Sequence, residues 1–164
     1  MKPPSATSKI LRLDALARRV ARARRGGERI VFTNGCFDLL HLGHLRSLEA
    51  ARRAGDRLVV AVNGDASVRR AKGAGRPLRP AAERMELVAA LACVDWVVPF
   101  SADTPLRLIV RLRPDVLAKG GDWTEGEIVG ANEVRAWGGR VLRLPLVRGR
   151  HTTLELARIR SRRP

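Results

Sequence analysis

The chain has 164 residues, of which 45% are hydrophobic and 29% charged, a balance typical of one soluble globular domain with a sizeable core. No apolar run reaches the roughly 20 residues of a membrane span, and no apolar segment of a signal peptide follows the basic N-terminus. We therefore expect a cytoplasmic protein without membrane contact. Two cysteines, Cys36 and Cys93, are too few and too far apart for a disulfide framework or a zinc site.

The formal net charge of +16 raises the question of nucleic-acid binding. However, 28 of the 32 basic residues are arginines spread over nearly every predicted helix and loop, and aromatic residues suited to base stacking make up only 4%. We therefore expect small anionic substrates and no nucleic acid. Two of the four lysines, Lys72 and Lys119, lie in glycine-containing loops and become candidate site residues.

The first residues, 1–8, contain two prolines and a serine and are interpreted as a flexible leader. Apolar residues then recur at helical spacing from Lys9 to Arg25, and Gly26-Gly27 ends the segment. This pattern predicts a peripheral amphipathic helix over 9–27 that packs on a single domain covering 28–161.

The most informative stretch runs from Thr33 to His44 and reads Thr-Asn-Gly-Cys-Phe-Asp-Leu-Leu-His-Leu-Gly-His. A buried strand is predicted before it, over 29–33, and a helix after it, ending near Ala54. Glycine lets a backbone approach a ligand closely, and a helix N-terminus favours an anion. His41 and His44 share one face of the first helical turn. The stretch therefore predicts a phosphate site with two histidines.

Two alternatives apply to this turn. Glycine-containing strand-to-helix turns are common in α/β proteins, so the prediction depends on the whole stretch and not on His-x-Gly-His alone. Cys36 is either a reactive thiol beside the histidines or a small residue that packs the turn, and we favour packing.

Leu58 to Val62 form an unbroken apolar run typical of a strand buried on both faces, which implies a parallel sheet covered by helices. Asp65 follows this strand, where it either holds a hydroxyl-bearing substrate or caps the next helix. Residues 72–80 are rich in glycine and proline and predict a mobile basic loop. Lys72 and Arg76 could close over phosphates when substrate binds.

The rest of the chain continues the alternation of helices and strands. We expect helices at 83–91, 104–112, 127–137 and 154–159, and strands at 94–98, 115–118 and 140–144. The pattern predicts a Rossmann-like, doubly wound sheet of about five parallel strands with helices on both faces. Two further loops carry polar residues, Lys119-Gly120-Gly121-Asp122 after a strand and His151-Thr152-Thr153 before the last helix. Because all these clusters lie at strand ends or helix starts, one shared site is expected.

Taken in order, the segments TNGCFDLLHLGH, VNGDASV, KGAGRP, VDWV, TP, KGGDW and TT resemble the nucleotidylyltransferase superfamily. They are most similar to the D-glycero-β-D-manno-heptose 1-phosphate adenylyltransferases, over about Ile30 to Ile159. The resemblance implies that ATP and a sugar 1-phosphate react to give ADP-heptose, for the lipopolysaccharide inner core, and pyrophosphate. It also implies Mg²⁺ and a homodimer. We expect the Mg²⁺ to bind mostly through phosphate oxygens and waters, and we name no protein ligand.

The resemblance assigns roles to the residues of these segments. The catalytic group comprises His41, His44, Lys72 and Lys119. The nucleotide is contacted by Asn34, Gly35, Cys36, Phe37, Gly43, Gly120, Thr152 and Thr153. The substrate or its site is held by Asp38, Asp65, Arg76 and Asp122. Relatives usually carry serine where this chain has His151, so the role of that position is open.

The chemistry fits these residue types. A phosphate monoester has a second pKa of about 6, so the attacking oxygen is already ionised near neutral pH and needs no general base. The reaction needs charge neutralisation at the α-phosphate and in-line positioning. His41 and His44 are therefore expected to donate hydrogen bonds, with no covalent intermediate.

Three other functions are weighed against this one. Cytidylyl transfer to glycerol 3-phosphate uses the same chemistry, but Lys119 and the 72–77 segment count against it. A nucleic-acid-binding module would explain the charge but not the histidines. A fragment of an aminoacyl-tRNA synthetase would share His-x-Gly-His, but the chain has no domain for binding tRNA.

Overall fold

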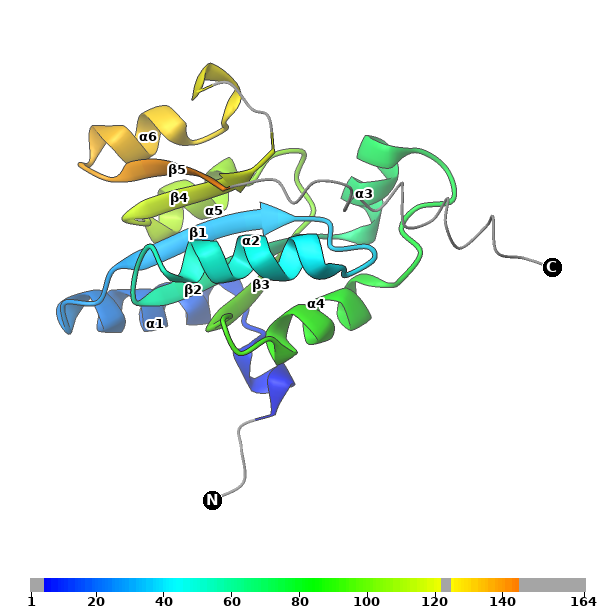
Figure 1. Ribbon diagram of the computed structural model, residues 1–164, viewed down its shortest axis with the longest axis horizontal. Helices are drawn as coiled ribbons and strands as arrows, with labels where there is room; N and C mark the ends of the chain where they lie inside the picture. The colour runs from blue at the N-terminus through cyan, green and yellow to red at the C-terminus, as the bar shows by residue number, and fades with distance from the viewer. Residues whose placement is uncertain (1–4, 122–124, 145–164) are drawn as a thin grey trace.

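The computed structural model describes residues 5–121 and 125–144. It contains a sheet of five parallel strands in the order β3-β2-β1-β4-β5 (Figure 1). The strands are β1 (Ile30–Gly35), β2 (Arg57–Asn63), β3 (Trp96–Phe100), β4 (Val116–Gly120) and β5 (Arg140–Leu144). The α-helices are α1 (Leu13–Arg25), α2 (Leu42–Arg52), α3 (Asp65–Lys72), α4 (Ala81–Ala90), α5 (Leu106–Leu112) and α6 (Ala131–Ala136). Two 3-10 helices, η1 (Ala6–Lys9) and η2 (Glu125–Glu127), complete the described elements.

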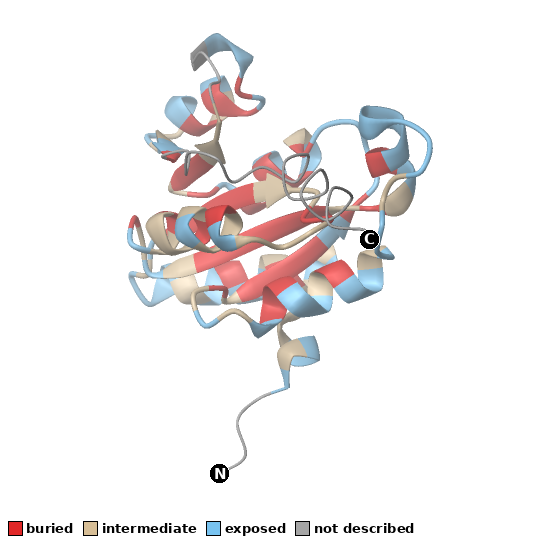
Figure 2. Ribbon diagram, turned by 45° about the vertical axis from the view of Figure 1, so that its right-hand side comes forward, coloured by how far each residue is buried: buried red, intermediate tan, exposed pale blue. Residues whose placement is uncertain are grey.

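Helices cover both faces of the sheet, which confirms the predicted doubly wound α/β fold. Side chains of α1, α5 and α6 pack against one face, and side chains of α2 and α4 against the other (Figure 1). Alternate strand residues serve the two cores: Ile30 and Phe32 face the first, and Val31 faces the second. The central strands are consequently buried almost throughout, as Figure 2 shows, which explains their continuous apolar sequence.

The first α-helix begins later than the predicted start at Lys9, and the described residues before it form other elements. Residues 6–9 form η1, which contacts α4, and α1 begins only at Leu13. Between them Ile10 makes a parallel bridge to Val97, and the Leu11 N–H donates to the Val97 carbonyl at 2.9 Å. The backbone at Ile10 and Leu11 is therefore paired with the strand β3 at the edge of the sheet, and the helix starts only after this pairing.

The predicted helix over 127–137 is divided in the structure. Gly130 takes a left-handed conformation with φ of 86°, and a Cβ at this position would lie 2.7 Å from Ile109 Cδ1. The chain turns at this glycine, and α6 starts at the next residue. The predicted helix over 154–159 lies outside the described residues. None of the helices that the structure describes has the length and hydropathy to cross a bilayer.

Candidate active site

The candidate site lies where the strand order reverses. From β1 the chain continues to β2 and β3 on one side, and later to β4 and β5 on the other, so β1 and β4 flank the switch point. Backbone pairing between these two strands covers Val31–Val116 and Phe32–Leu117. Beyond that pairing, Lys119 Nζ donates to Asn34 Oδ1 at 3.0 Å. A crevice at the carboxyl ends of such strands is the usual ligand site of open α/β sheets.

The two histidines are placed by the start of α2. His41 is the N-cap, with extended backbone, and its Nδ1 accepts a long hydrogen bond of 3.4 Å from the His44 N–H. The His41 carbonyl accepts from the same N–H at 3.0 Å. The two imidazoles stack with ring centroids 3.9 Å apart. The predicted pairing of the histidines on the first helical turn is thus what the structure contains.

His44 is the electrostatically unusual member of the pair. Its Nδ1 is buried and has no hydrogen-bond partner in the described part of the chain. Burial, assisted by positive charge on His41 and Lys72, lowers the pKa of His44 from 6.5 to about 4, although a hydrogen bond with the Leu39 backbone opposes the shift. His44 is therefore neutral near pH 7 in the ligand-free protein.

Phe37 fixes the shape of the turn between β1 and α2. It has a φ of 49°, which is uncommon for a residue other than glycine, and its side chain is 7% exposed. The Phe37 ring contacts the His44 ring at 5.3 Å. It also lies against Gly35, where a Cβ would come within 3.0 Å of the Phe37 ring. A side chain at Gly35 would therefore force the Phe37 ring to shift, so close packing favours glycine here in addition to the close ligand approach expected from the sequence.

Asp38 is engaged by the basic loop that joins α3 and α4. It is 2% exposed, and its oxygens accept from Arg76 Nη1 at 2.7 Å, the Leu78 N–H at 2.6 Å and the Arg79 N–H at 3.3 Å. Burial would raise the pKa of Asp38, but these hydrogen bonds and the Arg76 charge hold it below its usual value. The loop, expected to be mobile, is thus tied to the turn at residues 76–79.

This geometry changes the expectations for Arg76 and Lys72. The Arg76 guanidinium pairs with Asp38 in the ligand-free protein instead of extending toward solvent. Lys72 is the last residue of α3 and does not belong to the loop. Its charge nevertheless contributes to lowering the His44 pKa, so Lys72 acts electrostatically on this histidine.

Lys119 and Gly120 are the last two residues of β4 and not part of a loop. Burial lowers the pKa of Lys119, while negative charge on Cys36 would raise it, which places the thiol near the ammonium. Cys36 itself is partly exposed, where we favoured a packed, buried residue. Among the described residues, a Cβ on Gly120 would meet no atom within 4 Å.

Arg84 is the residue that the sequence analysis missed. It is 0% exposed and lies in α4, where its Nη2 donates to Asp65 Oδ1 at 2.7 Å. Asp65 is the first residue of α3, and its carboxylate also forms an ion pair with Arg84. One signal was present: Arg84 stands four residues before Val88, on the buried face of the same helix.

The remaining predicted residues divide into two groups. Asn34, Gly35, Cys36, Phe37 and Gly43 come together at the β1–α2 turn. Asp122, His151, Thr152 and Thr153 lie outside the described residues, so their predicted roles stay predictions. Within the described residues no group of three or more His, Cys, Asp and Glu side chains is placed to hold a metal ion.

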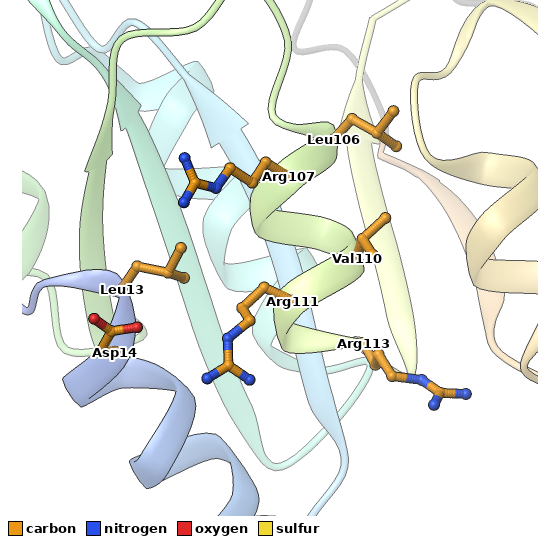
Figure 3. A pocket seen from close by; sticks show the side chains of 7 residues that line it. All are labelled: Leu13, Asp14, Leu106, Arg107, Val110, Arg111 and Arg113. Carbon is orange, nitrogen blue, oxygen red and sulfur yellow. The ribbon is translucent and has the colours of Figure 1, made fainter.

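A separate groove of about 690 Å³ lies between α1 and α5 (Figure 3). Leu13 and Asp14 of α1 face side chains of α5 across it, and Arg107 and Arg111 project along one side. None of the residues predicted for the site lines this groove. It is therefore distinct from the candidate active site at the carboxyl ends of β1 and β4.

A doubly wound parallel sheet with a His-x-Gly-His turn at its switch point and lysines beside it defines the class of nucleotidyltransferases. The model of the cytidylyltransferase-like family matches residues 32–151. The chain belongs to this family, which uses nucleoside triphosphates as substrates.

Comparison with individual proteins supports the same placement. The chain is 58% identical to the bifunctional protein HldE of Halorhodospira halophila, over 97% of this chain and 33% of that protein. It is 54% identical to HldE of Geotalea uraniireducens, over 96% of this chain and 32% of that protein. The chain thus spans about one third of these relatives.

Solved structures also match. A lipopolysaccharide core biosynthesis protein from Thermoplasma volcanium has 26% identity and a TM-score of 0.64, over 74% of this chain and 99% of that one. Pantothenate synthetase from Thermus thermophilus, at 22% identity and a TM-score of 0.51 over 79% of this chain and 60% of that one, shares the fold. The family resemblance drawn from the sequence is confirmed.

Proposed function

We propose that the chain transfers the adenylyl group of ATP to D-glycero-β-D-manno-heptose 1-phosphate and releases pyrophosphate, forming ADP-heptose for lipopolysaccharide assembly. The proposal is supported by the motifs that resemble heptose 1-phosphate adenylyltransferases and by identity of more than half to the HldE proteins. The likeness to a lipopolysaccharide core biosynthesis protein adds to this support. We retain the expectations of a cytoplasmic enzyme and a homodimer as parts of the proposal.

One observation carries the proposal: the cationic and imidazole groups converge on the carboxyl ends of β1 and β4. His41 and His44 stack at the start of α2, Lys72 is close enough to influence His44, and Lys119 is bound to Asn34 across the switch point. No carboxylate base is needed, because the attacking phosphate oxygen is ionised near neutral pH. These groups are suited to neutralising a triphosphate during in-line attack.

The described carboxylates of the site are already occupied. Asp38 is bound by the 76–79 segment, and Asp65 is paired with Arg84. Mg²⁺, which would add further neutralisation of the phosphate charge, is therefore proposed to bind through phosphate oxygens and waters, with no ligand named in the chain. The side chains of this chain bind, orient and donate to the phosphates.

The charge state of His44 gives it a defined part in binding. Its neutral form in the free protein avoids a buried cation beside Lys72. The negative charge of a bound triphosphate reverses this balance and favours protonation, so that His44 can donate to a phosphate oxygen. Nucleotide binding is therefore proposed to be coupled to proton uptake at this residue.

A second candidate is cytidylyl transfer to a small phosphate such as glycerol 3-phosphate, because the matching family model is described as cytidylyltransferase-like. The two functions share the histidine turn and differ in nucleotide and acceptor. A panel of ATP and CTP against heptose 1-phosphate and glycerol 3-phosphate, with pyrophosphate release as the readout, separates them. Turnover confined to CTP would overturn the adenylyltransferase proposal.

The same assay tests the histidines. His41→Ala and His44→Ala are expected to lower kcat by about 100-fold or more, as for loss of a donor to a transition-state oxyanion, while circular dichroism shows an intact fold. Arg111→Ala, which lines the groove between α1 and α5 away from the candidate site, is the control and is expected to keep wild-type turnover. A folded His44→Ala variant with wild-type kcat would contradict the proposed site.

A further inference from the structure

Arg84 has the largest of the side chains that the structure describes as fully buried, and it is a cation. Burying a charged group is costly unless it is paired and hydrogen-bonded. The three partners of Arg84 come from three different segments around the candidate site. The buried guanidinium therefore makes contacts between these segments that an apolar side chain would not make.

The guanidinium donates in three directions. Nη1 donates to the carbonyl of Cys36 in the β1–α2 turn, Nη2 to Asp65 Oδ1 at the start of α3, and Nε to the carbonyl of Arg79 at 2.9 Å. A planar fork of fixed donors is required for this, and a lysine ammonium cannot reproduce its geometry. Figure 1 shows α3, α4 and the loop between them around the carboxyl end of β1.

Asp38 makes a second link between two of these segments. Its carboxylate accepts from the Arg79 N–H, while Arg84 donates to the Arg79 carbonyl, so the backbone of this one residue is held from both sides. The turn of residues 36–38 and the loop of residues 76–79 are therefore joined by an acidic and a basic side chain together.

The contact with Cys36 leads to His44. The peptide unit between Cys36 and Phe37 is planar, so fixing the Cys36 carbonyl also fixes the direction of the Phe37 N–H. Phe37 holds a left-handed conformation, and its ring contacts the ring of His44. Arg84 thus acts on His44 through the backbone of Cys36 and the side chain of Phe37.

The contact with Asp65 leads to Lys72. Asp65 and Lys72 are the first and last residues of α3, so anchoring the beginning of this short helix sets where its last residue lies. We propose that Arg84 is a positioning residue for the nucleotidyl-transfer site, which holds His44 and Lys72 in register across the β1–α2 turn and α3. The expected effect of Arg84 on turnover rests on the proposed function, whereas its effect on the positions of His44 and Lys72 does not.

The test compares Arg84→Lys with Arg57→Lys. Arg57 is a matched control because it also has several ionic partners, Glu28 and Asp95, but it lies at the opposite, amino end of β2. Two readouts are used: kcat for ATP with heptose 1-phosphate, and the pH titration of the His44 imidazole by NMR in the ligand-free protein. The chain has three histidines, which keeps the imidazole spectrum simple to assign.

For Arg84→Lys we expect a folded protein whose kcat falls at least tenfold and whose His44 signals titrate at a different pH from wild type. Arg57→Lys should lose stability but keep kcat within about twofold and the wild-type titration. If the His44 titration of Arg84→Lys matches that of wild type, or its kcat changes no more than that of Arg57→Lys, the inference is wrong.

A second variant covers the case in which Arg84→Lys does not fold. Asp65→Asn keeps the guanidinium and weakens its hold on α3, and the His44 titration is expected to move in this variant too. An unchanged titration would overturn the inference. Because the titration needs no substrate, absence of turnover in the wild type would refute the proposed function without deciding the role of Arg84.

Discussion

The lowered pKa of His44 makes the stability of the protein depend on pH in a defined window. In the unfolded chain the imidazole has its ordinary pKa of 6.5, whereas in the folded, ligand-free protein the value is about 4. Below pH 6.5 the unfolded state therefore binds a proton that the folded state does not. The resulting loss of stability begins near pH 6.5 and is complete below about pH 4.

The size of this loss follows from the two pKa values. One pKa unit corresponds to about 1.4 kcal/mol, so the full effect of a shift from 6.5 to about 4 amounts to about 3.5 kcal/mol. At pH 5 the linkage relation gives about 2 kcal/mol. Asp38 and Glu28 have pKa values below their usual range, so their contributions to stability are also lost as the pH falls. These contributions cancel when two proteins that both keep Asp38 and Glu28 are compared.

The assay is urea unfolding of the wild type and of His44→Asn at pH 7, 6, 5 and 4.5. The Asn variant has no titrating group at this position, so its free energy of unfolding should fall less steeply between pH 6.5 and 4. We expect the difference between the two proteins to change by about 2 kcal/mol from pH 7 to pH 5. Parallel curves would show that His44 titrates normally and would refute the account of its burial.

Three further predictions concern single residues. Lys119→Met is expected to lower kcat/KM about 100-fold in the pyrophosphate assay, because it removes the ammonium at the switch point, and a loss below fivefold would contradict its role. Asp38→Asn should release the loop after α3, which limited trypsin digestion detects as faster cleavage after Lys72, and an unchanged rate would show that the carboxylate does not anchor it. Gly130→Ala should destabilise by about 1–3 kcal/mol in thermal unfolding without altering kcat, because φ is positive there and Ile109 blocks the Cβ; wild-type stability would exclude this strain.

The elements of the sheet could be predicted because their signals are local. The continuous apolar runs of β1 and β2 and the helical spacing after His41 lead directly to a covered parallel sheet. The five strands and the position of the histidines at the start of α2 follow from those patterns. The helix boundary at Leu13 was not predictable in this way, because the pairing of Ile10 with Val97 depends on where β3 lies.

The polar contacts around the histidines could not be predicted, because they depend on side chains that are distant in sequence. Nothing local to Asp38 indicates that its partners stand about 40 residues later, and its apparent role was therefore substrate binding. Arg84 resembles any surface arginine of a basic chain until α4 is packed on the sheet. Charge alone does not reveal which of 32 basic residues is buried.

The short ladder between β1 and β4 has a consequence for the order in which the site forms. This ladder contains two residue pairs, against six between β1 and β2, and it brings together residues 85 apart, as in the hydrogen bond from Ile30 to Asp115. Closing a loop of that length costs about 1 kcal/mol more free energy, through lost chain entropy, than closing the loop of 27 residues between Arg29 and Asp56. The junction that carries Asn34 and Lys119 is thus the least local and least paired of the sheet. We therefore expect folding to complete the active site late and local opening to expose it early.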